Sequence, residues 1–117
     1  MATRQTVIDY ITNNYAAEPV YTFKKFPDYA TFKTPQGKWF GLLMNVPQSK
    51  LGLPGTAEID VIDLKVDPEL AGILRQKPGY LPAYHMNKEH WLTVLLNEQT
   101  DDATLKQLID DSYNTVN

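Results

Sequence analysis

The feature that most constrains the fold is a pair of strand-like segments separated by only three residues. Residues 29–34 and 38–46 are rich in aromatic and aliphatic side chains, and a Pro-Gln-Gly turn at 35–37 lies between them. So short a connection joins antiparallel strands, because parallel neighbours need a crossover of about a dozen residues or more. Gly37 can adopt the positive φ that a tight turn requires. The two segments are therefore predicted to form a β-hairpin.

A third strand is predicted over residues 58–65, after a loop over 47–57 that is rich in proline and glycine. The apolar side chains of this strand fall on both faces, with Val61 on one face and Ile62 and Leu64 on the other. A strand that is apolar on both faces is typical of the interior of a sheet.

Helical patterns precede, interrupt and follow these strands. The clearest helix start is Asp67-Pro68-Glu69, where Asp67 can cap the free N–H groups and Pro68 suits the first turn. Ile73 is expected on the buried stripe of this helix, and Thr100 is expected to cap the last helix. Helices are predicted over 3–15, 67–77 and 101–115, and further strands over 80–86 and 91–96.

The order of the predicted elements defines the fold class. The chain has 117 residues, of which 43% are hydrophobic, as in one globular domain. We expect a single α+β domain over residues 1–117, with two layers. In this fold, a five-stranded antiparallel sheet is covered by helices on one face.

The residue content excludes several kinds of chemistry. No cysteine is present, which excludes disulfides, thiolate metal ligands and cysteine nucleophiles. The two histidines, His85 and His90, are not four positions apart, the spacing that aligns two metal ligands on a helix. Ser49 and Ser112 lie outside a Gly-x-Ser-x-Gly context, and no glycine-rich phosphate loop is present. The sequence thus predicts no catalytic residue and no metal or cofactor site.

The sequence also lacks the signals of membrane targeting. No apolar run approaches the roughly 18–20 residues that span a bilayer. The first residues lack the apolar core of a signal peptide. We therefore expect a cytoplasmic protein without membrane contact.

Charge is unevenly distributed along a chain whose net charge is −3. Residues 1–50 contain six Lys/Arg and three Asp/Glu, whereas residues 98–117 contain one Lys and five Asp/Glu. The positive half can form a basic face for nucleic-acid phosphates, with the hairpin as a wing. Solubilising surface lysines are the simpler interpretation. The candidate nucleic-acid-binding residues are Lys24, Lys25, Lys33, Lys38, Lys88 and His90.

The densest group of polar and aromatic residues lies between the last two predicted strands. It reads His85-Met86-Asn87-Lys88-Glu89-His90-Trp91. Asn87 can close a local turn through its side chain, and Trp91 begins an apolar strand. We therefore interpret His85, Asn87 and Trp91 as a structural motif whose main role is to fold this segment.

This segment and the following Leu92-Thr93-Val94 resemble the MmcQ/YjbR family of small bacterial proteins. That family carries a His-x-Asn-Lys-x-His-Trp-x-Thr-Val segment, and every fixed position is present here. Residues 64–75 and 108–113 are similar to the family's helices as well. The resemblance implies an α-β(3)-α-β(2)-α domain with an antiparallel sheet. It also implies DNA binding, with which the family is commonly labelled, on a fold likened to a double wing.

Two other functions remain open from the sequence. The hairpin contains more aromatic residues than one buried face requires, namely Tyr29, Phe32, Trp39 and Phe40. The exposed side of the sheet is therefore a candidate surface for a protein or peptide partner. The other alternative is a small-ligand site or an active site in a cleft. Its residues would be His85, Glu89 and His90.

Replacing the tryptophan tests the structural interpretation of the motif. We expect Trp91→Ala to lower the free energy of unfolding by about 3–5 kcal/mol, as for other large aromatic residues in a core. Urea denaturation followed by circular dichroism measures the change. A loss below about 1 kcal/mol would show that this side chain lies outside the core.

Overall fold

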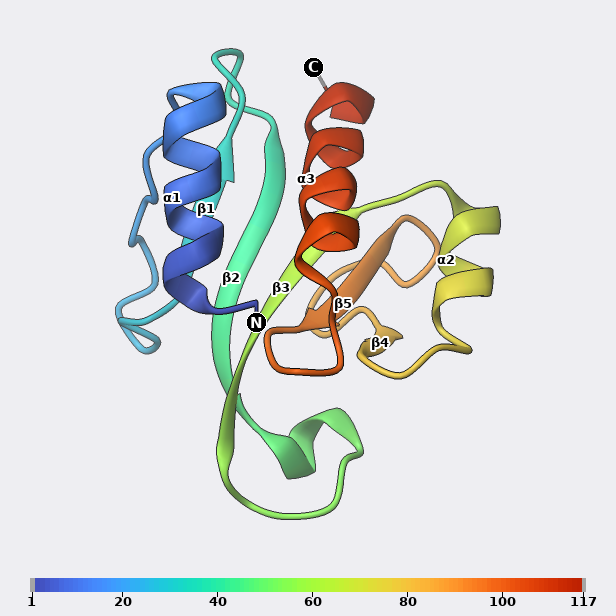
Figure 1. Cartoon of the computed structure of the whole chain (residues 1–117). Helices are drawn as coiled ribbons and strands as arrows, with labels where there is room; N and C mark the ends of the chain where they lie inside the picture. Colours follow the sequence, from blue (N-terminus) through green and yellow to red (C-terminus); the bar gives the residue numbers. More distant parts are fainter. Residues whose placement is uncertain (1, 117) are drawn as a thin grey trace.

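The strands pair in the order β1-β2-β3-β5-β4, and every neighbouring pair is antiparallel. The computed structural model describes residues 2–116 and places the helices against one face of this sheet (Figure 1). The predicted α+β fold and its element order are confirmed. The strands are β1 (Ala30–Lys33), β2 (Trp39–Pro47), β3 (Glu58–Lys65), β4 (Tyr80–Pro82) and β5 (Trp91–Leu95). The helices are α1 (Arg4–Tyr15), the short 3-10 helix η1 (Gln48–Leu51), α2 (Pro68–Leu74) and α3 (Asp102–Val116).

The hairpin and the interior strand form as their patterns predict. Thr34 N donates to Lys38 O at 2.8 Å, and Gly37 adopts φ +84° in the turn between β1 and β2. β3 lies between β2 and β5, with Val61 on one face and Ile62 on the other.

Asp101, and not Thr100, caps α3. The Asp101 carboxylate accepts a hydrogen bond from Thr104 N at 3.0 Å. Thr100 is buried against Gly79, where an added Cβ would lie 2.7 Å from the Thr100 hydroxyl oxygen. The predicted cap is therefore wrong by one residue, because packing against Gly79 fixes the threonine side chain instead.

Two predictions about the middle of the chain are also wrong. β4 ends at Pro82 rather than at residue 86, since proline has no N–H to offer to a strand ladder. Ile73 is 58% exposed because the short helix α2 turns Ala71 and Leu74 toward the core.

The main core lies between the sheet and the three helices. Its members come from all three helices and from every strand. The largest fully buried side chains in it are Phe32, Phe40, Ile11, Leu43, Ile62, Leu64, Leu92, Leu105 and Ile109.

A polar contact also fastens α1 to α3. The Tyr10 hydroxyl donates to the Asp110 carboxylate at 2.8 Å, and the Tyr15 hydroxyl donates to the same carboxylate. Burial and these hydrogen bonds raise the pKa of both tyrosines, so both hydroxyls keep the protons that they donate at neutral pH.

The opposite face of the sheet is covered as well, but by loops. Leu42, Met44, Val61 and Leu95 form a second core on this face and are at most 3% exposed. The side chains that cover them come from the 21–29 segment, the β2–β3 connection and the 83–90 segment, and they include Phe23, Leu51, Leu53, Tyr84 and Met86. The expected exposed sheet face is therefore absent, because these loops bury it.

A β-bulge in β2 divides the aromatic residues between the two faces. Phe32 lies opposite Gly41 and Lys33 lies opposite Trp39, so Phe40 is an extra residue between them. Phe40 consequently packs in the core under the helices, although Leu42, two positions further on, belongs to the opposite core. Side chains two positions apart share a face in a regular strand.

The hydroxyl of Ser112 in α3 supports this bulge. It donates to Phe40 O at 2.6 Å and accepts from Lys65 N at 2.9 Å. One buried hydroxyl thus bridges β2 and β3 where their direct pairing ends at Gly41 and Leu64.

Removal of this hydroxyl should destabilise the fold. We expect Ser112→Ala to lower the free energy of unfolding by about 1–3 kcal/mol, because a buried carbonyl and a buried N–H lose their partner. Urea denaturation measures the loss. The matched control is Ser49→Ala, at an exposed serine of η1, which should change stability by less than about 0.5 kcal/mol. Equal effects of the two variants would contradict the bridging role.

Candidate functional site

A cavity of about 370 Å³ opens on the loop-covered face of the sheet. The 21–29 segment, β2 and the 83–90 segment each contribute to its walls. We call it the aromatic pocket, and its lining residues are Phe23, Phe26, Tyr29, Trp39, Leu42, His85 and Met86. Its size and apolar walls are those of a small-ligand site.

The rings of the pocket pack in defined geometries. Phe26 stacks on Tyr29 with centroids 4.6 Å apart, and Phe23 meets Tyr29 edge-on at 5.9 Å. Phe23 also meets Trp39 edge-on at 6.3 Å. These are favourable aromatic arrangements, so the pocket is held together before any ligand arrives. Phe26 is nevertheless 46% exposed, which leaves part of its surface available for contact.

His85 lines the pocket from a strained backbone position. Its φ is +68°, in the left-handed region that residues other than glycine seldom adopt. The imidazole lies 4.0 Å from the Tyr84 ring and 6.4 Å from the Tyr29 ring, centroid to centroid. Such backbone strain is frequent at functional sites.

The rest of the histidine-containing segment is organised by hydrogen bonds within the loop. The Asn87 side-chain oxygen accepts from Glu89 N at 2.8 Å and from His90 N at 3.2 Å, which closes a turn. Lys88 Nζ donates to Ala83 O at 2.9 Å and so joins the two ends of the loop. Trp91, 7% exposed, then begins β5.

A buried acid lies beneath this loop. Asp63 in β3 is fully buried, and its Oδ1 accepts from the Thr93 hydroxyl at 2.5 Å. The same hydroxyl accepts from Tyr84 N at 2.8 Å, which attaches the loop to the sheet. Burial raises the pKa of Asp63 to about 7, against the opposing effects of the Thr93 hydrogen bond and the Lys88 charge. Asp63 Oδ2 has no hydrogen-bond partner among the described residues.

The candidate lysines do not form one group. Lys24 and Lys25 are exposed in the segment between Phe23 and Phe26, beside the aromatic pocket. Lys38 lines a neighbouring cavity together with Lys65, which no pattern in the sequence connects with it.

The remaining candidates lie elsewhere or are already engaged. Lys33 lies in a separate groove beside the end of α1, so the two lysines that flank the hairpin turn do not share a groove. Lys88 is engaged with Ala83 O. His90 lies 3.9 Å from the Glu89 carboxylate, and neither lines the aromatic pocket, so the three residues of the alternative cleft do not share this cavity.

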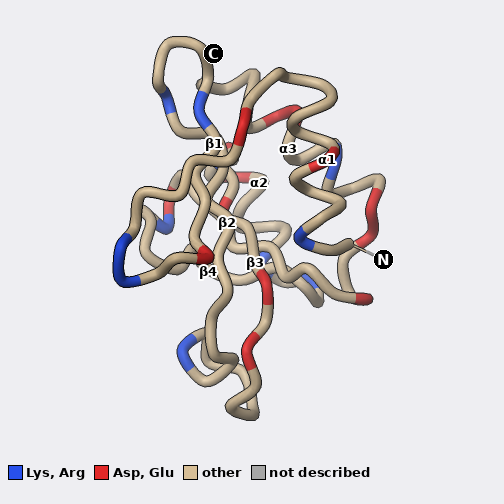
Figure 2. The backbone as a smooth tube through the Cα atoms, turned by 90° about the vertical axis from the view of Figure 1, so that its left-hand side faces the viewer, with Lys and Arg blue, Asp and Glu red and all other residues tan. Residues whose placement is uncertain are grey.

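The pocket nevertheless has a positive border. We define the lysine border as Lys24, Lys25, Lys38, Lys65 and Lys88. Asp28 and Glu89 lie in the 21–29 and 83–90 segments with three of these lysines, and β3 contains Glu58, Asp60 and Asp63 as well as Lys65. In Figure 2 the longest blue stretch lies on a loop at the left edge of the tube, and the other blue segments are scattered together with red ones.

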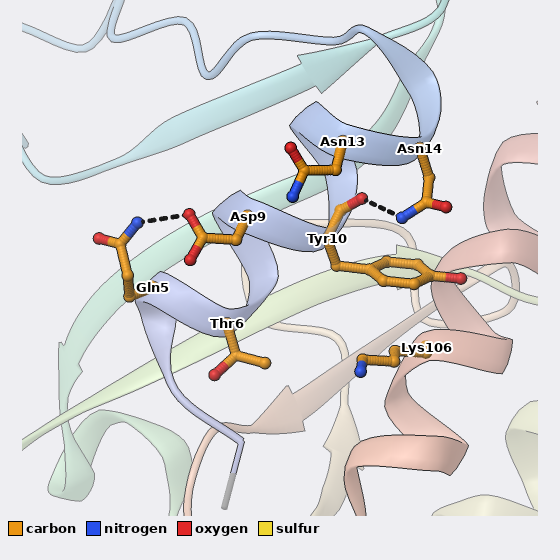
Figure 3. A pocket seen from close by; sticks show the side chains of 7 residues that line it. All are labelled: Gln5, Thr6, Asp9, Tyr10, Asn13, Asn14 and Lys106. Atoms are coloured by element: carbon orange, nitrogen blue, oxygen red, sulfur yellow. Dashed lines mark hydrogen bonds between the residues drawn. The ribbon is translucent and has the colours of Figure 1, made fainter.

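A second, more polar groove between α1 and α3 has little to offer a ligand. In Figure 3, Gln5 and Asp9 face each other along α1, at 2.8 Å, and Asn14 is turned back to the Tyr10 carbonyl. Lys106 from α3 lies over the Tyr10 ring, 5.5 Å from its centroid. The polar groups of this groove are thus largely used within the helix layer.

Two structural findings bear on metals and membranes. Residues 2–116 contain no group of three or more His, Cys, Asp or Glu that could hold a metal ion. Within the same residues, no helix has the length and apolar character needed to cross a membrane.

Fold and pocket together define a class of small α+β domains, with helices on one sheet face and a loop-bordered aromatic pocket on the other. The chain belongs to the YjbR family, whose sequence model matches residues 13–115. It is 40% identical over 114 residues to the uncharacterized protein YyaQ of Bacillus subtilis (strain 168), covering 97% of each chain. The resemblance found in the sequence is thereby confirmed.

Solved structures are similar over the whole chain. A crystal structure of a Pseudomonas syringae protein is 50% identical with a TM-score of 0.95, covering 98% of this chain and 99% of that one. The Deinococcus radiodurans protein DR2400 is 26% identical with a TM-score of 0.77, covering 99% of this chain and 79% of the other.

Several residues of the site are absent from the sequence-based candidates. Phe23, Phe26 and Met86 carry no periodic signal, because they lie in loops. Asp63 did leave a signal, since an acid in a strand that is apolar on both faces is a costly residue. Its hydroxyl partner, Thr93, lies in the family segment.

The buried acid predicts an unusual pH dependence. Because the pKa of Asp63 is raised in the folded state, its contribution to stability is complete below the unfolded pKa and is lost as pH rises toward about 7. The difference between 3.8 and about 7 corresponds to on the order of 4 kcal/mol. We expect Asp63→Asn to remove most of this decline when urea denaturation is measured from about pH 4 to pH 8.

The control is Glu98→Gln, at an exposed carboxylate in the β5–α3 connection. This variant should keep the wild-type pH profile. If the Asp63→Asn and wild-type profiles were parallel, the acid would not titrate in this range.

Proposed function

We propose that the protein binds single-stranded nucleic acid, with DNA as the favoured form, at the aromatic pocket and the lysine border. The observation that carries the proposal is an open pocket of aromatic rings with the five lysines of the lysine border in the neighbouring segments. Single-strand binding sites combine stacking surfaces with positive charge in this way.

The aromatic pocket favours unpaired bases over a duplex. A base stacked on an aromatic side chain contributes about 1–3 kcal/mol, and only an unpaired base can leave its own stack to do so. Phe26 and Tyr29 already stack on each other, and the 46% exposure of Phe26 leaves ring surface for a base. A wing that follows duplex phosphates would use Lys33 and Lys38 together, and these lysines lie in different grooves.

The lysine border supplies the electrostatic part. Lys24 and Lys25 are exposed neighbours of the pocket, where they can approach phosphates while the rings hold a base. Binding that depends on such contacts weakens linearly in log K as log salt rises, by about 0.7 for each phosphate contacted on a single strand.

A fluorescence titration with a short oligothymidylate at low salt tests the proposal. Both tryptophans lie at or beside the pocket and report on binding. We expect Phe26→Ala to weaken binding roughly 5- to 150-fold, the equivalent of the loss of one stacked base.

The matched control is Tyr21→Ala, in the same segment. Tyr21 is 53% exposed and does not line the pocket, so this variant should bind like the wild type. If the wild type does not bind at tens of micromolar protein, which is roughly the range of typical non-specific affinities, the proposal is refuted. If the two variants bound the oligonucleotide equally well, the aromatic pocket would not be part of the binding site.

A second candidate is a protein or peptide that inserts an apolar side chain into the same pocket. The observation in its favour is that none of the lysines lines the pocket itself. Such binding would vary little with salt, whereas nucleic-acid binding would vary steeply, so the salt series distinguishes the two.

A further inference from the structure

A second cavity, of about 490 Å³, adjoins the aromatic pocket. The two share Trp39 and Met86, which therefore form the ridge between them. The other residues that line the second cavity are Lys38, Lys65, Trp91, Thr115 and Val116. The two cavities therefore lie side by side, on either side of these two side chains.

The second cavity differs from the first in charge. It contains two lysines, and none of the described residues that line it is acidic. Lys38 is exposed at the start of β2, whereas Lys65 is half-buried at the end of β3. The Ser112 hydroxyl fixes the backbone N–H of Lys65, so this lysine extends from a rigid position.

The surroundings of these ammonium groups suit an anion. Lysine presents a compact charge with three donors, which contacts a phosphate from many directions. Trp91 and Val116 are buried at the same cavity and give it an apolar wall. Charge attraction is stronger beside such apolar surface than in bulk solvent. The Thr115 hydroxyl is not available, since it donates to Asp111 O at 2.7 Å.

We infer that the second cavity is a phosphate subsite, in which Lys38 and Lys65 bind the phosphate next to a base held in the aromatic pocket. This inference rests on the proposed function. It identifies the ligand as a strand of two or more nucleotides rather than a free base or nucleoside.

The test compares an oligothymidylate of about eight nucleotides, within the range of known single-strand sites, with thymidine, which has no phosphate. The variants are Lys38→Gln and Lys65→Gln, and the matched control is Lys106→Gln, on α3 in the helix layer. Tryptophan fluorescence follows binding at several salt concentrations. Circular dichroism verifies that each variant is folded.

We expect each of the two cavity variants to lower the salt slope for the oligonucleotide by about 0.7, the value for one lost contact on a single strand. Thymidine binding should be unchanged in both, because the nucleoside occupies only the aromatic pocket. Lys106→Gln should change neither measurement.

The outcomes separate this inference from the proposed function. If the wild type binds the oligonucleotide but Lys38→Gln and Lys65→Gln keep its salt slope, the lysine stems merely cover Trp91 and the phosphate subsite is refuted. If thymidine binding falls as much as oligonucleotide binding, the two lysines act on the base pocket, which also refutes it. Failure of the wild type to bind any oligonucleotide would refute the proposed function and the subsite with it.

Discussion

The two hydrogen bonds of the Ser112 hydroxyl hold the sheet in the form on which the candidate site depends. They satisfy Phe40 O and Lys65 N beside the bulge in β2. Without the extra residue, Phe40 would share the face of Leu42, and Trp39 would point toward the helices. The bulge places Trp39 in the aromatic pocket instead. Through Ser112, the helix layer therefore influences which aromatic side chains lie on the opposite face of the sheet.

Thr93 has a comparable role for the 83–90 loop. Its hydroxyl donates to Asp63 and accepts from Tyr84 N, so one group connects β3, β5 and the loop that carries His85 and Met86. Burial makes the Asp63 carboxyl group costly to ionise, and this raises its pKa. Costly buried acids are frequent at functional sites, and this one lies directly behind the loop that borders the aromatic pocket.

The sequence predicts those parts of the structure whose signals are local. The hairpin, the interior strand β3 and the buried face of α3 follow from turn residues and from the periods of two and 3.6. The loops on the second sheet face have no period, so their packing could not be predicted. The bulge at Phe40 separates Lys33 from Lys38, and tertiary contacts bring Lys65 beside Lys38. Of the pocket residues, the sequence pointed to Tyr29, Trp39 and His85, whereas Asp63, an acid within an apolar strand, was a signal left unused.

The net charge of the whole chain does not predict which ligands the loop-covered face of the sheet attracts. The last twenty residues carry much of the negative charge, and most of them form α3 in the helix layer. The lysine border lies around the loop-covered face. At about 0.1 M salt, charge interactions are screened over about 10 Å, whereas the shortest dimension of the domain is 26 Å. The acids at the start of α3, about 20 Å along the helix from Thr115 at the second cavity, therefore do not cancel the lysine border, whereas Asp111 lies one turn from Thr115 and weakens it there.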